Sequence, residues 1–547
     1  MSTSAQCGLV PHDSTRAAAL AGLGLALLSL TLYARSIGFE FVDFDDRTVL
    51  LAHPRLYDER SLVASLRQIF VDYFPREEPL LLRDLSWALE ARLFGFRNPL
   101  GYHLGNVLLN AANVALLFLF LRHATRRFWL SLAVATVFAV LPVHVEAVSW
   151  VMGRKDVLST CFVLAALLAQ SYELEQTRAA RRWSLRLVTL LCTVLALAAK
   201  IAAMACVLLL ALHRVFHPYL AGLRAPDVPL DWKRLLFDAA PKLLPHAVAT
   251  AGIVLWYQGV LAQFGVIGQR GPGTFSAEHL TNVAAFVPLV VGSYLRSLVW
   301  PVGLSNFYRW PHVAIPLTAV EQLASIGIAA ALAVGFAYCC LRRRDLAFFA
   351  LAFGASLFPY LGFVFVDIWR ADRYIYLASF AVVAIAAVLL ARLAQRGGRG
   401  ARLAVAGVSI VFTAGCVVQT LRQQSVWRDN ESLWKYEAHR ATPSLLSIQA
   451  LASEYAARAE RETDAARRQA LIEQARGEVL RGIELERSLG RQPTRYKTSE
   501  QLELARLHGR LGRLEAIEGA PVESQIGHYE TSYRLAPHRA SALALAK

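Results

Sequence analysis

Asp43, Asp45 and Asp46 lie in a short acidic segment, FVDFDDR at residues 41–47, directly after the first long apolar run. Carboxylates so close to the end of a membrane helix are costly to bury, so we expect them at the water boundary, facing a cavity rather than lipid. A carboxylate in that position can act as a general base on a hydroxyl group. For an isolated acidic cluster, a solvated turn with a helix cap is the simpler interpretation.

Polar side chains in three other parts of the chain complement these carboxylates. One group recurs on a single face of a predicted helix, where polar contact between helices is the alternative interpretation, favoured for its last two members. A second group occupies the predicted tip of a helical hairpin, where a charge-balanced turn is the alternative. A third group adds cations beside predicted spans. The groups are His103, Asn106, Asn110 and Asn113; His144, Glu146, Arg154, Lys155 and Asp156; and Lys200, Arg370 and Arg373.

Carboxylates and cations at one membrane surface suit a particular reaction. A base activates a hydroxyl, while fixed positive charge stabilises a phosphate leaving group held among the lipid headgroups. The adjacent carboxylates of Asp45 and Asp46 offer an alternative, because Mg²⁺ and Mn²⁺ prefer carboxylate and water oxygens. No third ligand is evident, so the metal is left open, and EDTA sensitivity of turnover would decide it.

Composition predicts a polytopic membrane protein of mainly α fold. The 547 residues are 56% hydrophobic, with a mean hydropathy of +0.40, which is too apolar for a soluble chain of this length. The net charge of +16 is compatible with nucleic-acid binding. However, the basic residues lie in short loops between apolar runs, as in proteins that they orient in a membrane, so no nucleic-acid partner is expected. The seven cysteines lack metal or redox spacing and are interpreted as packing residues.

The apolar runs predict a helical bundle of about eleven spans, with the N-terminus cytoplasmic and the C-terminus external. A lone lysine at mid-membrane is costly, so we expect two short helices meeting at Lys200 rather than one long helix. The segment 283–300, which contains Arg296, is interpreted as re-entrant or interfacial. The spans are 16–36, 100–121, 128–150, 157–172, the two helices within 187–213, 243–258, 320–341, 346–366, 374–393 and 403–421.

The chain is expected to divide into four parts. Residues 1–37 hold the cytoplasmic N-terminus and first span, and residues 38–99 form an external loop with interfacial helices at 61–74 and 80–96. Residues 100–422 form the bundle, and residues 423–547 form an external domain. In that last part, helical periodicity covers 444–460, 463–484, 499–517 and 522–535. Tyr529, Tyr533 and Pro537 are spaced as at the end of a tetratricopeptide repeat (TPR).

A series of motifs along the chain resembles one enzyme family. The order is distinctive, although each motif alone is weak. The motifs are Phe44-Asp45-Asp46 with His53-Pro54, NPLGYHLGN at 98–106, PVHVEAVSWVMGRKD at 142–156, Ala199-Lys200, DRYIYL at 372–377 and Trp427 to Trp434. The series resembles the GT-C membrane glycosyltransferases that carry TPRs, namely the transmembrane-and-TPR protein O-mannosyltransferases and their bacterial relatives.

The resemblance implies a transferase that moves a sugar, such as mannose, from a polyprenyl- or dolichyl-phosphate carrier to Ser or Thr hydroxyls of a protein. Asp45 and Asp46 match the family's first-loop aspartates, one of which is the base, and Lys200 matches a lysine near the carrier phosphate. The other matches are Arg373 with Tyr374, beside the same cavity, and His144 with Glu146. Leu141 and Ile201 depart from the family pattern, which bears on donor and acceptor specificity.

The predicted mechanism is a single inverting displacement. Asp45 or Asp46 removes the acceptor proton, while Lys200, Arg373 and Arg296 offset the charge on the departing phosphate. The site and the TPR-like domain are expected on the periplasmic side of a bacterial inner membrane, or on the lumenal side of the endoplasmic reticulum. Two alternatives from other classes are a non-catalytic scaffold that binds partners through its C-terminal helices, and a transporter, which would call for internal repeat symmetry.

Overall fold

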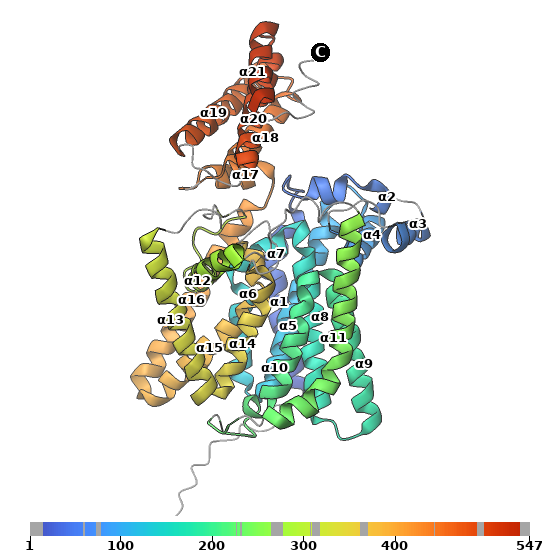
Figure 1. Ribbon diagram of the computed structural model, residues 1–547, viewed down its shortest axis with the longest axis vertical. Helices are drawn as coiled ribbons and strands as arrows, with labels where there is room; N and C mark the ends of the chain where they lie inside the picture. The colour runs from blue at the N-terminus through green and yellow to red at the C-terminus, as the bar shows by residue number, and fades with distance from the viewer. Residues whose placement is uncertain are drawn as a thin grey trace, which may run out of the picture. The chain divides into compact units, whose positions relative to one another are not determined.

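The computed structural model describes a helical chain in two compact units (Figure 1). The described residues are 15–57, 61–72, 78–225, 227–229, 232–263, 277–306, 308, 318–361, 370–441, 443–489 and 497–535, and none of these forms a strand. Unit 1 comprises residues 1–304 and 320–424, and unit 2 comprises residues 305–319 and 425–547.

Unit 1 is built from long apolar helices, as the composition predicts. Among the described residues, nine helices are long and apolar enough to cross a membrane, or ten if a pair bent by 56° counts as one span. The chain is therefore a multi-pass membrane protein. The nine helices are α1 (Thr15–Tyr33), α5 (Pro99–Thr125), α8 (Arg154–Glu175), α9 (Ala179–Ala199), α10 (Ala205–Leu220), α11 (Trp232–Gln263), α13 (Ala319–Arg342), α15 (Ser379–Arg396) and α16 (Gly398–Val426).

Among the described residues, the segment 346–366 is the predicted span that no long apolar helix matches. Helix α14 (Arg344–Leu357) has only 14 residues, about 21 Å at the usual rise, which is shorter than the roughly 30 Å of a bilayer core. A short turn, Phe358–Tyr360, follows it with Pro359 inside. Proline cannot donate the backbone hydrogen bond that would continue a helix. The end of this predicted span, residues 362–366, lies outside the described residues.

The helix break at Lys200 is confirmed. Helix α9 ends at Ala199, Lys200 adopts an extended backbone with φ −158° and ψ 126°, and the short turn Ile201–Met204 leads into α10. The lysine therefore lies where the chain turns rather than in the middle of a helix. Helix α12 (Ala277–Val299) covers the segment predicted to be re-entrant; its path through the membrane stays a prediction.

The bent pair joins α6 (Phe128–Val140) to a series of short helical turns. Helix α6 ends before Pro142, and the chain continues through Pro142–His144, α7 (Val145–Ser149) and Val151–Gly153 into α8. Gly153 allows this fold, since a Cβ there would collide with the backbone of Ala147. The predicted hairpin tip is thus a compact and almost wholly buried structure rather than an open loop.

Short helices lie at one end of unit 1, as Figure 1 shows for α2 (Pro54–Tyr57), α3 (Leu62–Arg67) and α4 (Leu81–Phe94), and α2 contacts the turn Asp46–Leu51. The turn Gln68–Asp72 continues α3. Helices α3 and α4 fall within the two interfacial segments predicted from mixed apolar and charged faces. Helix α4 packs against both α5 and α2, so it joins the short helices to the bundle.

Unit 2 contains the four predicted C-terminal helices, preceded by α17 (Asn430–Ala438). They are α18 (Leu445–Ala459), α19 (Ala465–Leu489), α20 (Lys497–Glu518) and α21 (Val522–Leu535). Helix α18 packs on α19, α19 on α20, and α20 on α21. The Ser444 side chain caps α18 by accepting a hydrogen bond from the Ser447 amide at 3.0 Å. Pro537, the last residue of the repeat-like motif, lies outside the described residues, so the TPR assignment stays a prediction.

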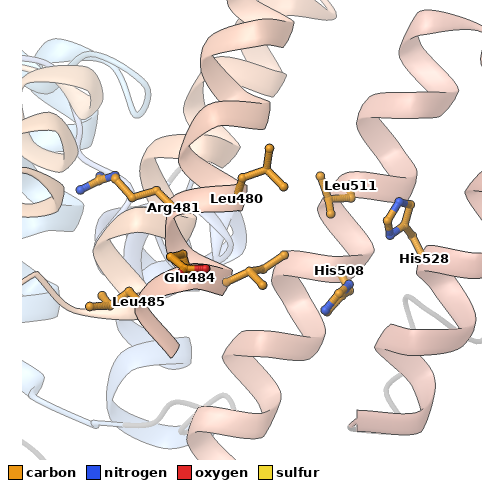
Figure 2. Close-up of a pocket in the computed structure, with 8 residues that line it drawn as sticks. Leu480, Arg481, Glu484, Leu485, His508, Leu511 and His528 are labelled. Atoms are coloured by element: carbon orange, nitrogen blue, oxygen red, sulfur yellow. The ribbon is translucent and has the colours of Figure 1, made fainter. Parts of the chain in front are cut away.

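A pocket of about 750 Å³ lies between α19, α20 and α21. Figure 2 shows that α19 supplies most of its lining, while His508 and Leu511 face it from α20 and His528 from α21. Leu480, Ile483, Leu485 and Leu511 make much of the lining apolar, and Arg481 and Glu484 add charges. The pocket is therefore amphipathic.

Candidate active site

The acidic segment places its two adjacent aspartates in different surroundings. Asp46 is buried and begins the π-helical turn Asp46–Leu51, and its carboxylate accepts a hydrogen bond from the Val42 amide at 2.9 Å. Burial raises the pKa of Asp46 to about 8, against the opposing effect of that hydrogen bond. Asp45 is half-buried. Asp46 is therefore held neutral near pH 7, and Asp45 is the more accessible carboxylate.

Asp43 makes a surface contact. Its side chain is 43% exposed and forms an ion pair with Arg47 at 3.3 Å. Exposed ion pairs of this kind contribute little to stability.

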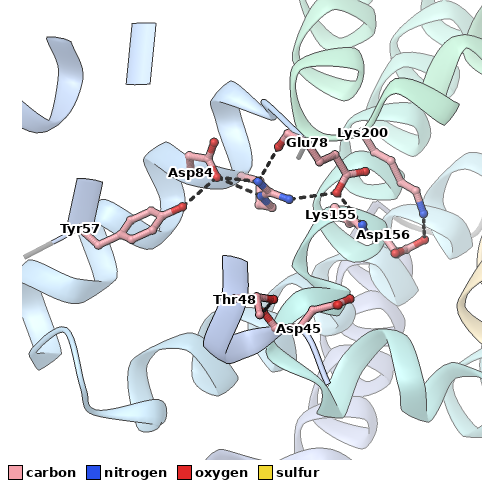
Figure 3. A network of polar contacts seen from close by, with 9 residues as sticks. Asp45, Thr48, Tyr57, Glu78, Asp84, Lys155, Asp156 and Lys200 are labelled. Carbon is pink, nitrogen blue, oxygen red and sulfur yellow. Dashed lines mark hydrogen bonds and ion pairs between the residues drawn. The ribbon is translucent and has the colours of Figure 1, made fainter. Parts of the chain in front are cut away.

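A chain of ion pairs connects the interfacial helices to the bundle (Figure 3). The Tyr57 hydroxyl donates to Asp84 at 3.1 Å, and Arg83 donates to Asp84 at 3.0 Å. Arg83 also donates to the Glu78 carboxylate at 3.1 Å. Lys155, from the start of α8, donates to the same Glu78 carboxylate at 2.7 Å. The pairs thus hold residues 78–84 against the bundle.

Lys200 lies beside this chain of ion pairs. Its amine donates to the Asp156 carboxylate at 2.5 Å, and its charge, with those of Lys155 and Arg83, lowers the pKa of Glu78 to about 2 although burial alone would raise it. Figure 3 shows the Asp45 carboxylate directed toward the side of the cluster where Lys155 and Asp156 lie. Carboxylates and ammonium groups from distant parts of the sequence therefore meet in one place.

Arg373 adds a guanidinium to the same place. It donates to the Glu146 carboxylate from its side chain and also from its backbone amide, the latter at 2.8 Å. Its guanidinium lies 5.3 Å from the centre of the Trp150 ring. Burial would lower the pKa of Arg373, but Glu146 and, more weakly, Asp156 and Asp45 raise it, so the arginine stays charged. Phe44, next to Asp45, contacts the same Trp150 ring with ring centres 5.1 Å apart.

Two tyrosines line the amine of Lys200. Tyr360 and Tyr374 stack with ring centres 4.2 Å apart and planes only 9° from parallel. The Lys200 amine lies 4.9 Å from the Tyr360 ring and 5.5 Å from the Tyr374 ring. An ammonium over an aromatic face is attracted by the ring quadrupole, so the rings and Asp156 together fix the position of this cation.

Arg154 forms hydrogen bonds that hold neighbouring helices together beside the cluster. Its guanidinium donates to Asn106 at 2.6 Å, to Ser86 at 2.9 Å and to the Tyr102 carbonyl at 2.8 Å, and it forms an ion pair with Glu90 at 2.8 Å. Ser86 and Glu90 belong to α4, whereas the other two partners belong to α5. Arg154 therefore joins α4 to the bundle and holds the start of α8, where Lys155 and Asp156 follow.

The two predicted site histidines contact residues outside the charged cluster. His103 Nε2 lies 3.4 Å from the Glu40 carbonyl. His144 Nε2 lies 2.9 Å from the Ser379 hydroxyl, and its ring contacts Phe138 with ring centres 4.4 Å apart. Both histidines are buried, so in this structure they contact neighbouring protein groups.

Asn110 and Asn113 connect helices, as the alternative interpretation of that helix face predicts. The Tyr376 hydroxyl donates to Asn110 at 2.6 Å, and Asn113 donates to the same hydroxyl at 3.0 Å. Asn106, which donates to the Trp150 carbonyl at 2.7 Å, supports the short turns that carry Glu146 and Arg154.

Two further predicted cations lie at α12. Arg370 donates to the Ser297 hydroxyl at 2.6 Å and lies over the Tyr294 ring at 5.6 Å. Arg296 is exposed on the same helix. The cations brought together around Asp156 and Glu146 are instead Lys155, Lys200 and Arg373.

Sequence reasoning missed several members of the cluster, among them Tyr57, Glu78, Arg83, Asp84 and Tyr360. Glu78 and Arg83 lie at the start of the predicted interfacial helix, where their charges resemble a solvated face. Tyr360 lies in an apolar run predicted to be a span. The one available signal is Arg83 beside Asp84, an adjacent pair of opposite charges near the start of a predicted helix.

The cluster can position a phosphate and a hydroxyl, since it offers buried cations beside a half-buried carboxylate. Among the described residues, no group of three or more His, Cys, Asp or Glu side chains is arranged to hold a metal ion.

Sequence comparison shows that the chain is similar to protein O-mannosyl-transferases, which confirms the predicted resemblance. It is 26% identical over 507 residues to Protein O-mannosyl-transferase Tmtc1 of Drosophila melanogaster, covering 76% of this chain and 57% of the relative. It is 33% identical over 183 residues to Protein O-mannosyl-transferase TMTC1 of Mus musculus, covering 31% of this chain and 18% of that relative. The chain thus spans little more than half of the Drosophila relative and less than a fifth of the mouse one. No protein-family model matches it.

Among solved structures, the chain aligns with ArnT from Cupriavidus metallidurans. The apo structure gives a TM-score of 0.35 at 12% identity, covering 97% of this chain and 77% of that one. The structure bound to undecaprenyl phosphate gives a TM-score of 0.36 at 15% identity, covering 94% of this chain and 79% of that one.

Proposed function

We propose that this chain is a membrane glycosyltransferase that moves a sugar from a polyprenyl- or dolichyl-phosphate carrier to a Ser or Thr hydroxyl of a protein. The distant sequence similarity to protein O-mannosyl-transferases supports the reaction class. One structural observation supports the proposal: the Trp150 ring contacts Phe44, next to Asp45, with ring centres 5.1 Å apart, and the Arg373 guanidinium lies 5.3 Å from the centre of the same ring. A base and phosphate-binding cations thus share one site.

Asp45 is the general base in this proposal. A base must be ionised near pH 7 and must reach the acceptor hydroxyl. Burial favours the neutral form of Asp46, whose carboxylate accepts the Val42 amide and so fixes the backbone of the acidic segment. Asp45 is half-buried and directed toward the cation cluster. Asp46 is therefore a positioning residue, and Asp45 takes the proton.

Lys200 and Arg373 bind the carrier phosphate, with Lys155 beside them. Charge-assisted hydrogen bonds from such groups to phosphate oxygens are roughly twice as strong as neutral ones. The Tyr360–Tyr374 stack and the Asp156 carboxylate hold the Lys200 amine in place before the donor binds. Cations positioned in advance stabilise the charge that develops as the phosphate leaves, without reorganisation during the reaction.

The reaction is a single displacement at the anomeric carbon. The acceptor oxygen forms a bond to that carbon while the bond from the carbon to the phosphate oxygen breaks, so the anomeric configuration inverts. The acceptor proton moves to Asp45. The bonding electrons leave with the phosphate oxygen, and polyprenyl phosphate remains beside Lys200 and Arg373.

The helices of unit 2 present the acceptor protein in this proposal. They pack as consecutive helical hairpins, the arrangement of TPRs, and their amphipathic pocket suits a peptide segment. The basic loops between spans orient the site and unit 2 to the periplasmic or lumenal face. The bilayer is that of a bacterial inner membrane or of the endoplasmic reticulum.

The proposal is tested by transfer of labelled sugar in reconstituted vesicles. Purified chain, polyprenyl-phosphate-linked mannose and a Ser/Thr-containing peptide are the components, and label in the peptide is the readout. A scaffold or a transporter would leave the peptide unlabelled. Addition of EDTA to the same assay decides whether a divalent cation is required at Asp45 and Asp46.

A further inference from the structure

The cations of the cluster in Figure 3 do not outnumber its carboxylates. The ion pairs connect three cations, Arg83, Lys155 and Lys200, with three carboxylates, and Asp45 is a fourth carboxylate in the same view. Arg373 is likewise matched by Glu146. The site therefore has little surplus positive charge for a phosphate. Each additional negative charge on a ligand is repelled by carboxylates that are already paired with the cations.

Glu78 is the carboxylate placed to act on such a ligand. One of its oxygens accepts from Lys155 at 2.7 Å and from Arg83 at 3.1 Å, and its backbone carbonyl accepts from Arg83 at 2.8 Å. The Glu78 side chain is 29% exposed, whereas those of Asp84 and Asp156 are 0% and 4% exposed. Glu78 is thus fixed in position, and an incoming phosphate can approach it.

Donor and product of the proposed reaction differ in charge at this phosphate. The donor is a phosphodiester, which carries one negative charge. The product, polyprenyl phosphate, is a phosphomonoester with a charge of about −1.5 to −2 at pH 7. A nearby fixed negative charge disfavours the product more than the donor, since repulsion is proportional to ligand charge.

We infer that Glu78 is a specificity-determining residue whose carboxylate makes the site prefer the monoanionic phosphodiester donor over the dianionic phosphomonoester product, and so promotes product release. This inference rests on the proposed function. It explains why Glu78 pairs with Lys155 beside the phosphate site. Without this carboxylate, the charge of Lys155 would strengthen the binding of both donor and product.

The test compares two ligands that differ only in charge: undecaprenyl phosphate and its methyl ester. Their affinities are measured for the full-length chain in nanodiscs, unmodified and as Glu78→Gln. We expect Glu78→Gln to strengthen binding of undecaprenyl phosphate by about tenfold, and binding of the methyl ester by about threefold or less. Equal strengthening of both ligands, or none, overturns the inference. Asp72→Asn removes an exposed carboxylate from the turn after α3 and should leave the ratio of the two affinities unchanged.

A measurement on the unmodified chain covers the case in which Glu78→Gln fails to fold. Lowering the pH from about 7.5 to about 5.5 protonates the phosphomonoester, whose second pKa is about 6, while Glu78, held by Lys155, Arg83 and Lys200, stays ionised. The affinity for undecaprenyl phosphate relative to its methyl ester should rise. An unchanged or lower ratio contradicts the inference.

The vesicle assay separates the two proposals. If the unmodified chain transfers sugar and Glu78→Gln shifts both affinities equally, only the inference about Glu78 fails. If Glu78→Gln changes the ratio and no sugar is transferred, the proposed reaction fails and the phosphate preference stands.

Discussion

Lys200 and Asp156 form an ion pair between the break that separates α9 from α10 and the first turn of α8. The side chains are 8% and 4% exposed. Leaving either charge buried without its partner would be costly. The pair thus fixes both the break and the position of the amine that we assign to the donor phosphate.

Replacing Lys200 by glutamine should weaken donor binding. A hydrogen bond to a charged group contributes about 1.5–3 kcal/mol, so the donor KM should rise by about 10- to 100-fold with a smaller change in kcat. Steady-state kinetics in vesicles measures both. Lys200→Arg keeps the charge and serves as the control. If the KM of Lys200→Gln stays at the unmodified value, the phosphate binds elsewhere.

The stability of the fold should depend on pH through Asp46. Its pKa is raised to about 8 in the folded chain, against about 3.9 in an unfolded one. Between these values the folded state holds a proton that the unfolded state lacks, so stability falls as pH rises from about 4 to about 8.

Asp46→Asn resembles the protonated form and removes this dependence. Thermal unfolding in detergent at about pH 5 and about pH 8 should show the midpoint of the unmodified chain falling relative to that of Asp46→Asn. A constant difference between the two proteins across this range would mean that Asp46 is ionised in the fold.

Sequence patterns predicted the helices and helix breaks that depend on residues close together in the chain. The break at Lys200 followed from the cost of a lone lysine in lipid, and α4 and α18–α21 followed from amphipathic periodicity. Helix α14 is shorter than the predicted span 346–366 because apolar composition alone does not reveal that α14 ends at Leu357. Hydropathy depends only on how many residues are apolar, whereas the length of α14 is set by the turn around Pro359 that follows it.

The sequence predicts that the acidic segment, Lys200 and Arg373 lie on one membrane face, but it does not predict which charges pair. The contact of Lys155 with Glu78 joins residues 77 positions apart. No local pattern specifies such a contact. The roles assigned to these residues, and the TPR nature of unit 2, stay predictions that the following experiments address.

Gly105 should be intolerant of even a methyl group. A Cβ at this position would collide with the side chains of Glu90 and Arg154, which pair against the glycine backbone. Gly105→Ala should therefore displace α4 and destabilise the chain by about 1–3 kcal/mol, with reduced transfer activity. Thermal unfolding and the vesicle assay measure the two effects. Gly24→Ala in α1, where nothing lies within 4 Å of the added atom, is the matched control, and equal behaviour of the two variants would contradict the packing described here.

A substitution in the pocket of unit 2 should reduce sugar transfer to the acceptor protein and leave donor binding unchanged. Leu480 is 54% exposed at the edge of this pocket. Leu480→Asp should reduce transfer to a folded acceptor by about tenfold, as expected for the loss of one apolar anchor, while donor binding is unchanged. Val522→Asp, at a residue of the same unit that is 62% exposed and lies outside the pocket lining, is the control. Equal losses in both variants would argue against the pocket as the acceptor site.

The assignment of the base is tested most directly by sugar transfer in vesicles with Asp45→Asn and Asp46→Asn. A positioned base contributes about 10²- to 10⁴-fold, so Asp45→Asn should lower kcat by that factor with expression unchanged, and Asp46→Asn should lower it by less than about tenfold. Turnover by Asp45→Asn at the unmodified rate, or no transfer by the unmodified chain, would contradict the account.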